Sequence, residues 1–500
     1  MHVSEIDWIG AAAKITPNVR NYIGGRWVTV TGLNRLEKCS PRDGRVLCQF
    51  GAGEVHEVDD AVATARSAFE DGRWSRLATQ GRKDALHRLA SLIETNREQL
   101  ALLESLDVGK PISDALGFDL PAAVATIRFS AEAADKIHGK VYAVDSSSLS
   151  YQLHRPLGVV AGVVGWNFPL LLAAGKIGPV LATGNSLVLK PSEFTSFSAA
   201  RLAELAVEAG VPEGVFNVIH GGPEVGDALA RHRDVDALTF TGSTRTEKQL
   251  LVSAGESNLK RLILECGGKA ANIVFDDCPD LDAVADAVVA RAFWNQGQVC
   301  TASSRLLIQE KIKARLLPMI IDRVAQLTPG DPLLPETKFG ALVSRVHQRK
   351  VEEYITSGQG EGVRVAFRSS ARPPLGDGFY VPPVVFDDVA PEKRIAREEI
   401  FGPVLCVMTF RDEHEAAAIA NSTIYGLSAI IWTRDLGRAH RVTHAIKAGW
   451  ITVNGTGRVS GGPSWGVLPI GGQKESGQGV EGGLEGLEEY LRKSSVQIFV

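Results

Sequence analysis

Short apolar runs alternate with helical patterns in the segment 158–265 of the chain. Five runs of about four to seven residues, rich in valine, isoleucine and leucine, predict buried strands at 158–164, 186–190, 215–219, 237–241 and 261–265. Residues 198–209 predict a helix between the second and third strands, because Leu202 and Leu205 share one face and Gly210 follows as a stop signal. Strands and helices that alternate in this way predict a parallel, doubly wound sheet.

A second alternating block follows the first. It has strand patterns at 271–275, 304–309 and 451–454 and a helical pattern at 281–295. Further helical patterns at 58–69 and 81–105 precede both blocks and are expected to flank the first sheet. The second block is long enough to form its own α/β domain.

The chain also carries a candidate arm and tail. Residues 139–154 predict a hairpin, and residues 486–500 predict a short helix followed by an apolar strand. We therefore expect an α/β protein with two doubly wound domains and a β-hairpin oligomerisation arm. The predicted boundaries are 1–135 and 155–264 for the first domain, 265–470 for the second, and 136–154 and 480–500 for the arm and tail. An apolar terminal strand is an unpaired edge, so we expect it to pair with another chain.

Composition narrows the class of protein. With 500 residues, of which 44% are apolar and 22% charged, the chain is expected to form several globular units. The net charge of −4, without a long run of one sign, argues against nucleic acid as a partner. The most apolar stretch, 159–189, is interrupted by Asn167 and Lys176, which argues against a membrane span.

Cysteine usage indicates the compartment. Six cysteines are too few for a disulfide scaffold, and none forms a CxxC pair of the kind that binds zinc, so no metal site is expected. The first 15 residues carry Glu5 and Asp7 and lack the basic start and apolar run of a secretory signal. We therefore expect a cytoplasmic protein.

Polar groups follow the predicted strands of the first sheet. Loops are generally polar, so one such end means little, but five coincident ends place amide, ammonium, carboxylate, glycine and hydroxyl groups on one rim. These groups belong to Asn167, Lys190, Ser192, Glu193, Gly221, Thr241, Gly242, Ser243 and Glu265. The rim is therefore the predicted binding edge.

Glycines and a carboxylate on this rim suit a dinucleotide. Gly221 and Gly226 lie at the start of one helix and Gly242 opens the next, where free N–H groups and the helix dipole favour a pyrophosphate. The spacing is not GxGxxG, and glycine at such turns also has a purely steric explanation. Glu193, three residues after Lys190, would accept hydrogen bonds from ribose hydroxyls and repel a 2′-phosphate, which favours NAD over NADP.

Cys300 and Glu265 are the candidate reactive side chains. A lone cysteine is usually an inert apolar filler, but Gly297 and Gln298 beside Cys300 argue against a dry core. Its thiol becomes a nucleophile once a dipole or a base activates it. Glu265 follows an apolar strand, where a glutamate is either an ion-pair partner or a base with a raised pKa, and the sequence leaves both readings open.

Several motifs resemble the signatures of the NAD(P)-dependent aldehyde dehydrogenase superfamily. They are Trp166-Asn167-Phe168-Pro169, Lys190-Pro191-Ser192-Glu193, Phe240-Thr241-Gly242-Ser243-Thr244, the segments 264–271 and 293–301, Glu399-Ile400-Phe401-Gly402-Pro403, and the tail 471–477. The similarity covers residues 20–495 and looks closest to bacterial γ-glutamyl-γ-aminobutyraldehyde dehydrogenases, notably at 231–309. The resemblance implies the aldehyde dehydrogenase fold, with an NAD-binding first domain and a catalytic second domain.

The resemblance also implies roles for individual residues. Cys300 would attack an aldehyde, Asn167 with the Cys300 N–H would hold the oxyanion, and Glu265 would activate the hydrolytic water. The implied catalytic set is Cys300, Glu265, Asn167 and Lys190. The implied NAD-binding set is Val164, Trp166, Lys190, Ser192, Glu193, Gly221, Gly226, Thr241, Gly242, Ser243, Glu399 and Phe401.

Departures from the family pattern concern the substrate. Family members often have tryptophan where Gly175 stands and a larger side chain where Ala122 stands, so a wider tunnel is expected here. Segment 461–470, where aminoaldehyde-oxidising relatives tend to place acidic or aromatic residues, carries no acid, and a desolvated ammonium without a carboxylate binds poorly. We therefore expect a bulky apolar or aromatic aldehyde in a tunnel lined by Phe168, Gly175, Phe293, Val299, Thr301 and Trp465.

Alternative interpretations stay open at this point. They are an aminoaldehyde dehydrogenase, a CoA-acylating relative, against which Glu265 argues, a cysteine hydrolase that works without NAD, and a non-catalytic protein of the same fold. Cys266, where the family usually has leucine, is either a small core residue or a second thiol that traps Cys300 on oxidation. The arm and terminal strand favour a dimer or a tetramer without distinguishing them.

Overall fold

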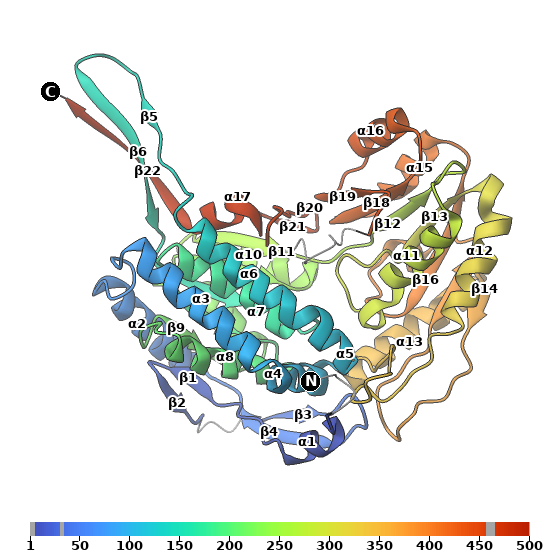
Figure 1. Ribbon diagram of the computed structural model, residues 1–500, viewed down its shortest axis with the longest axis horizontal. Helices are drawn as coiled ribbons and strands as arrows, with labels where there is room; N and C mark the ends of the chain where they lie inside the picture. Colours follow the sequence, from blue (N-terminus) through green and yellow to red (C-terminus); the bar gives the residue numbers. More distant parts are fainter. Residues whose placement is uncertain (1–5, 31–34, 457–465, 500) are drawn as a thin grey trace.

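The structure, a computed structural model, describes residues 6–30, 35–456 and 466–499. Figure 1 shows two lobes side by side, each built around one large sheet, and a narrow arm that projects from the first lobe. This architecture confirms the predicted α/β fold class. Among the described helices, none is both long and apolar enough to cross a bilayer.

The first sheet contains the five predicted parallel strands, in the order β9-β8-β7-β10-β11. Their bounds are β7 Val159–Val163, β8 Ser186–Lys190, β9 Phe216–Val218, β10 Ala237–Thr241 and β11 Arg261–Glu265. Antiparallel strands extend both edges, namely β1 (Asn21–Ile23) and β2 (Arg26–Val28) beyond β9, and β21 (Gly477–Gln478) beyond β11. The carboxyl ends of the parallel strands therefore share one edge.

Each face of the first sheet is covered by its own helices, because successive strand residues point to opposite sides. Val160, Leu187 and Ile263 belong to the core formed with α3, α4, α6, α7 and α8, whereas Val159 and Val188 pack with α2, α9 and α10. The bounds are α2 Val55–Glu70, α3 Thr79–Thr95, α4 Arg97–Val108, α6 Leu120–Ala133, α7 Pro169–Ala182, α8 Phe197–Glu208, α9 Pro223–Arg231 and α10 Thr244–Gly255. Burial on both faces explains why these strands are continuous apolar runs.

The structure divides one of the predicted helical segments. The pattern at 81–105 predicted helical structure, and α3 ends there at Thr95 while α4 begins at Arg97. Asn96 lies at the break, where its side-chain amide donates to the carbonyl of Leu92 at 2.8 Å. Asparagine competes for backbone groups in this way, which local periodicity does not reveal.

The second sheet has the order β14-β15-β16-β13-β12-β18-β19, parallel except for the edge strand β14. Its strands are β12 Ala271–Val274, β13 Arg305–Gln309, β14 Arg364–Arg368, β15 Val384–Asp387, β16 Val404–Phe410, β18 Ser428–Trp432 and β19 Trp450–Val453. Helices α11 (Leu281–Phe293) and α12 (Glu310–Val324) cover one face, and α13 (Arg345–Gly360), α15 (Glu413–Ala420) and α16 (Leu436–Ala445) cover the other.

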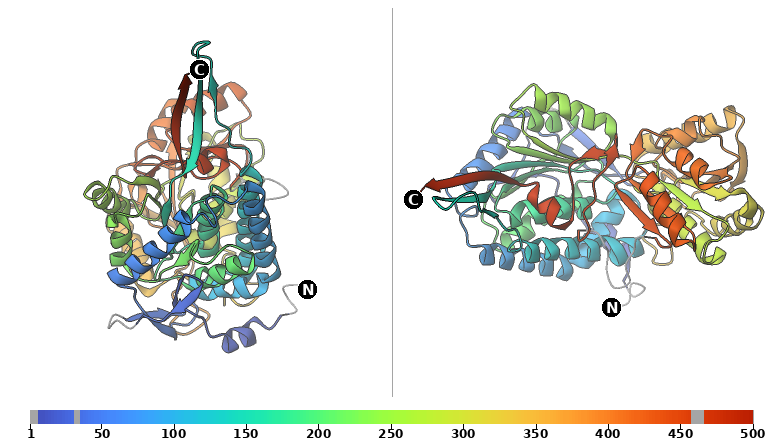
Figure 2. Two further views of the ribbon diagram at one scale, coloured as in Figure 1. Left: turned by 90° about the vertical axis from the view of Figure 1, so that its left-hand side faces the viewer. Right: turned by 90° about the horizontal axis from the view of Figure 1, so that it is seen from above.

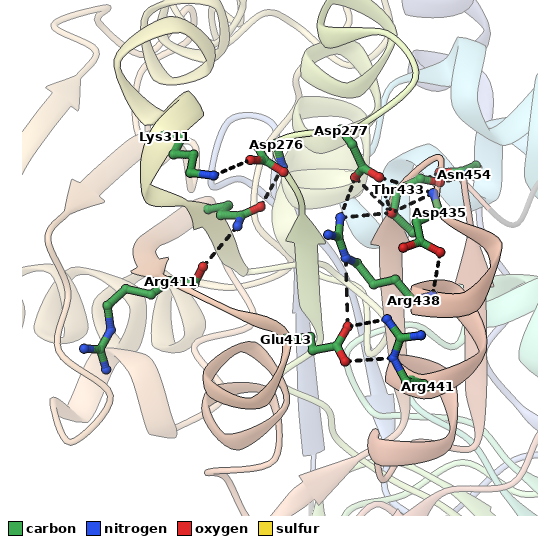
Figure 3. A network of polar contacts seen from close by, with 11 residues as sticks. Asp276, Asp277, Lys311, Arg411, Glu413, Thr433, Asp435, Arg438, Arg441 and Asn454 are labelled. Atoms are coloured by element: carbon green, nitrogen blue, oxygen red, sulfur yellow. Dashed lines mark hydrogen bonds and ion pairs between the residues drawn. The ribbon is translucent and has the colours of Figure 1, made fainter.

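A polar network ties α15 and α16 to the strands of the second sheet (Figure 3). Arg441 binds Glu413 through two hydrogen bonds of 2.8 and 3.0 Å, and Arg438 donates to Asp277 at 2.8 Å. The hydroxyl of Thr433 also donates to Asp277. Because these charged groups are mutually paired, we assign the network a structural role.

The arm is a three-stranded antiparallel sheet in the order β22-β6-β5, with bounds Leu491–Phe499, Ser148–Pro156 and Val141–Tyr142. It extends away from both lobes in Figures 1 and 2. Within this chain, β22 pairs along its whole length with β6. The expected pairing of the terminal strand with another chain therefore stays a prediction for the edge of β22 that faces away from β6. That edge stays open in the described part of this chain, since β22 lies at the margin of the three-stranded sheet.

Candidate active site

The ends of the parallel strands bring the predicted rim residues together. Val163 is the register partner of Lys190, and Thr241 is the partner of Glu265. The chain continues in register beyond the strands, since the N–H of Val164 donates to the carbonyl of Lys190 at 3.1 Å. The first sheet therefore carries Lys190, Thr241 and Glu265 on a single edge.

The loop that carries Cys300 has an unusual backbone. After α11 the chain enters the left-handed region at three successive residues, Asn295 with φ 49°, Gln296 with φ 57° and Gly297 with φ 73°. A side chain at Gly297 would collide with the carbonyl of Gly402. Hydrogen bonds hold the turn, because Gln298 donates to the carbonyl of Asn295 at 3.1 Å and accepts from the N–H of Val343 at 3.0 Å.

Asn167 lies against this cysteine loop. Its side-chain amide is buried and donates to the carbonyl of Gln298, two residues before Cys300, at 3.0 Å. Asn295 in turn donates to the backbone carbonyl of Asn167, also at 3.0 Å. The predicted oxyanion donor and the predicted nucleophile therefore belong to one hydrogen-bonded unit.

Cys300 is half-buried, and its thiol is protonated at rest. Burial raises its pKa to about 12, and the negative charges of Glu399 and Glu265 act in the same direction. Attack on a carbonyl carbon requires the thiolate, so this thiol needs a base. The carboxylates near it are the available bases.

A pair of glycines brings these groups into one site. A side chain at Gly267 would collide with the carboxylate of Glu399, and one at Gly268 would collide with the backbone carbonyl of Cys300. The N–H of Gly268 donates to Glu399 at 2.9 Å. The turn after Glu265 therefore packs directly against both the cysteine loop and Glu399, and only glycine permits this approach.

Glu265 is suited to act as the base. It lies at the end of β11, and burial raises its pKa to about 8, while the positive charge of Lys176 opposes the shift. The N–H of Gly472 donates to its carboxylate at 3.4 Å. A carboxyl group that titrates near neutral pH exchanges protons readily with a thiol or a water.

Lys176 was not among the predicted site residues. It is fully buried on α7 and forms an ion pair with Glu481, and burial lowers its pKa to about 7. The signal in the sequence is that Lys176 is the one charged residue of the apolar helix α7. An isolated charge in such a helix requires a buried partner, which the sequence does not identify.

The predicted cofactor residues fit an NAD molecule on this edge. The ammonium of Lys190 lies 3.6 Å from the carboxylate of Glu193, which is 28% exposed and so is accessible to a ribose. The side chain of Ser243 caps α10, and Gly222 precedes α9, so both helices direct their N-termini to the loops of this rim. Thr241 adds a buried hydroxyl without a hydrogen-bond partner in the described part of the chain.

The remaining cofactor candidates also converge. The rings of Trp166 and Phe401, far apart in sequence, meet edge to face with centroids 5.1 Å apart. His347, 5.0 Å from Trp166, forms a 2.7 Å hydrogen bond with the backbone carbonyl of Phe401. Phe401 itself has a φ of 60°, a strained value for a bulky residue, and its ring contacts and backbone hydrogen bond hold this conformation.

An aromatic cluster lies beside Asn167 and contains two predicted substrate residues, Phe168 and Val299. Phe168 meets Trp294 at 5.1 Å and Phe118 at 6.2 Å, and Phe118 meets Trp294 at 4.5 Å. The other members of this aromatic cluster are Ala122, Leu171, Leu172 and Ala302. Gly175, four residues after Leu171 on α7, shares that face. Among the described residues, apart from its chain neighbours and the backbone of its own helix, no atom lies within 4 Å of the position that its Cβ would take.

Two predicted lining residues lie away from the aromatic cluster. Phe293 lies in the core of the second sheet with Val274 and Leu306, so it does not join the aromatic cluster. α11 ends at Phe293, and the extended backbone of the next residue directs Trp294 to the cluster instead. Thr301 is buried with its hydroxyl bound to Arg291 at 3.1 Å. Trp465 lies outside the described residues.

Phe118 was also missed. It belongs to a π-helical turn, Ala115–Asp119, in which the usual helical spacing is lost. A π-turn shifts the register of the residues that follow it, so a search for 3.6-residue periodicity does not place Phe118 on the cluster face. No simple pattern in the sequence identifies this residue.

The sequence and the fold of this chain are shared with a known family of enzymes. The sequence model of the aldehyde dehydrogenase family matches residues 27–496. The chain belongs to this family. Over 492 residues it is 44% identical to the NADP/NAD-dependent aldehyde dehydrogenase PuuC of Escherichia coli K12, a match that covers 98% of each chain.

Solved aldehyde dehydrogenase structures superpose closely on this chain. A mutant of the P. syringae indole-3-acetaldehyde dehydrogenase AldA, in complex with NAD+ and IAA, has a TM-score of 0.95 and 45% identity and covers 99% of each chain. The γ-glutamyl-γ-aminobutyraldehyde dehydrogenase of Burkholderia cenocepacia J2315 has a TM-score of 0.94 and 44% identity over 99% of each chain. The expected similarity to γ-glutamyl-γ-aminobutyraldehyde dehydrogenases is confirmed.

Proposed function

We propose that this aldehyde dehydrogenase oxidises an aldehyde to a carboxylic acid with NAD as the electron acceptor, through a covalent intermediate on Cys300. The observation that carries the proposal is the Gly267-Gly268 turn, which packs the end of the Glu265 strand against Cys300 and Glu399. The site thus combines a nucleophile, a base and an amide donor, the set required for acyl chemistry.

The first step is attack on the aldehyde. Glu265 accepts the thiol proton, the sulfur of Cys300 forms a bond to the carbonyl carbon, and the electron pair of the carbonyl moves to oxygen. The amide of Asn167 and the N–H of Cys300 donate to that oxyanion, a contribution of about 10²- to 10³-fold for each donor. When bound, NAD supplies the hydride acceptor.

The second step is hydrolysis. Loss of hydride from the thiohemiacetal carbon leaves a thioester on Cys300. Glu265 releases the thiol proton to solvent and then takes a proton from water, whose oxygen bonds to the acyl carbon. The carbon–sulfur bond breaks, the proton passes from Glu265 to the sulfur, and the acid leaves. A carboxyl with a pKa of about 8 can exchange protons in both steps.

We propose a bulky aromatic aldehyde as the substrate. The aromatic cluster around Phe168 and the open space at Gly175 support this choice, as does the likeness to an indole-3-acetaldehyde dehydrogenase. The alternative is an aminoaldehyde, and the likeness to a γ-glutamyl-γ-aminobutyraldehyde dehydrogenase supports it. The apolar character of the cluster favours the aromatic substrate, because its side chains offer a desolvated ammonium no carboxylate to pair with.

One assay tests both levels of the proposal. NADH formation is measured with purified protein, NAD and no CoA, on indole-3-acetaldehyde, hexanal and γ-aminobutyraldehyde, with C300S as the inactive control. We expect turnover of aldehydes, with the highest kcat/KM for the indole compound. Absence of NADH formation would overturn the reaction, whereas a preference for the aminoaldehyde would overturn only the substrate class.

We also propose the assembly and location of the enzyme. The arm exposes apolar side chains, including Val141, Leu149 and Phe499, which supports self-association into a dimer or a tetramer. All six cysteines are free thiols, which supports a reducing cytoplasm. Light scattering of the intact chain, compared with a variant that lacks residues 491–500, tests the assembly.

The domain boundaries predicted from the sequence, at residues 135, 155 and 264, stay predictions.

A further inference from the structure

Lys110 lies beneath the aromatic cluster and contacts one of its rings. Its ammonium is 4.2 Å from the centroid of the Phe168 ring, and the residue is 1% exposed. It forms a buried ion pair with Asp119, which has no exposed surface. A cation over an aromatic face is attracted by the ring quadrupole, most strongly where water is excluded.

Asp119, the ion-pair partner of Lys110, is next in sequence to a member of the aromatic cluster. Asp119 is the last residue of the π-helical turn, and the residue before it is Phe118. Phe118 meets Trp294, while Asp119 binds Lys110, which contacts Phe168. The three aromatic rings of the cluster and the buried ion pair therefore form one closed set of contacts.

A second buried acid supports the same loop. Glu104 on α4 accepts a hydrogen bond of 3.1 Å from the N–H of Leu170, two residues after Phe168. The loop that holds Asn167 and Phe168 is thus supported by Glu104 through its backbone and by Lys110 through the ring. Glu104 and Lys110 have almost no exposed surface, so solvent does not screen these contacts.

We propose that Lys110 is a positioning residue that sets the preference of this enzyme for electron-rich aromatic aldehydes, by holding the Phe168 ring in place. The proposal rests on the proposed function and specifies its substrate class. The cation occupies one face of the ring and draws its π electrons toward it, which leaves the opposite face less negative. That face suits an electron-rich ring such as indole and is a poor neighbour for an ammonium.

The experiment compares substrates that do and do not reach Phe168. The variant K110M/D119N removes the cation together with the charge it would leave unpaired. The matched control is K83M, because Lys83 also forms an ion pair, at 2.9 Å to Asp135, but lies outside the cluster. Steady-state rates are measured for indole-3-acetaldehyde and for propanal, together with the KM for NAD.

We expect kcat/KM for indole-3-acetaldehyde to fall about tenfold through KM in K110M/D119N, as the loss of a buried cation–π contact implies. Propanal oxidation and the KM for NAD should stay within about twofold of the native values, and K83M should change neither substrate. Equal losses of kcat/KM for both aldehydes would show a merely structural role and overturn the proposal. A kcat/KM for indole-3-acetaldehyde that is unchanged in K110M/D119N would also overturn it.

A second variant keeps the test decisive if the double variant does not fold. Replacing Phe168 with 3,4,5-trifluorophenylalanine preserves the shape of the ring and weakens its attraction for a cation. The same selective loss on the indole substrate is expected, and an unchanged ratio would overturn the proposal. If the native enzyme prefers the aminoaldehyde, the proposed substrate class is wrong. The ratio of kcat/KM for indole-3-acetaldehyde over propanal, compared between native and variant enzymes, still tests whether Lys110 positions Phe168.

Discussion

The side-chain amide of Asn295 donates to the backbone carbonyl of Asn167 at 3.0 Å, across a sequence separation of 128 residues. The same amide is 3.3 Å from the carbonyl of Gln298, to which Asn167 itself donates. One left-handed asparagine therefore joins the loop that precedes the nucleophile to the loop that carries the oxyanion donor. Asparagine is among the side chains that tolerate this backbone conformation best.

Replacing Asn295 with Asp should reduce kcat about 10²-fold, because both N–H donors are lost and the oxyanion donor is released from its position. The KM for NAD should change little. The comparison is N258D, since Asn258 also donates to two backbone carbonyls, at 2.8 and 2.9 Å, but lies in the first lobe between α10 and β11. A kcat for N295D equal to that of N258D would contradict this role.

The pH dependence of the reaction should follow Glu265. Its pKa is raised to about 8, so below that pH the carboxyl retains its proton and does not accept another. We expect kcat/KM to rise between pH 7 and about pH 9 and then to level, in rates of NADH formation measured across that range. E265Q should lose this rise together with turnover, and a native profile that falls with pH would exclude Glu265 as the base.

Lys176 should influence that profile. The charged form of Lys176 favours the ionised form of Glu265, and a pKa of about 7 leaves part of Lys176 charged where the rise begins, so K176M should shift the lower end of the rise to higher pH. Because Lys176 also pairs with Glu481, the variant K176M/E481Q is used to avoid an unpaired charge. An unshifted profile in the double variant would show that Lys176 has only a structural role.

Glu193 should set the choice between the two nicotinamide cofactors. Its carboxylate would repel the 2′-phosphate of NADP, so E193Q should narrow the ratio of kcat/KM for NAD over NADP by about tenfold, or about 1.4 kcal/mol. The ratio is measured on one aldehyde at fixed ionic strength, because screening weakens the effect. If E193Q and the native enzyme have the same ratio of kcat/KM for NAD over NADP, Glu193 does not contact the ribose.

Substitutions at Gly175 test the width of the proposed substrate tunnel. G175W should exclude indole-3-acetaldehyde while propanal is still oxidised, because the indole ring of the variant fills the space that faces the aromatic cluster. G175A is the control and should keep both activities. It should also raise the free energy of unfolding by about 0.5–1 kcal/mol, since alanine is favoured over glycine within a helix.

Much of this enzyme was predictable from local sequence. The strands of the first sheet follow from short apolar runs, because burial on both faces of a parallel sheet requires such runs. The motifs around Asn167, Glu265 and Cys300 predicted candidate reactive groups, whose roles stay a proposal, and the structure brings these motifs to one place. Local sterics, burial and side-chain chemistry act over a few residues, and a sequence shows them directly.

Other features were decided by tertiary structure alone. The backbone at the end of α11 directs Trp294, and not Phe293, into the aromatic cluster, and the π-helical turn places Phe118 in the same cluster. The partner of Lys110, and the pairing of β22 with its own chain, depend on contacts between separate segments. Such contacts depend on packing geometry in three dimensions, and hydrophobic periodicity along the chain does not specify them.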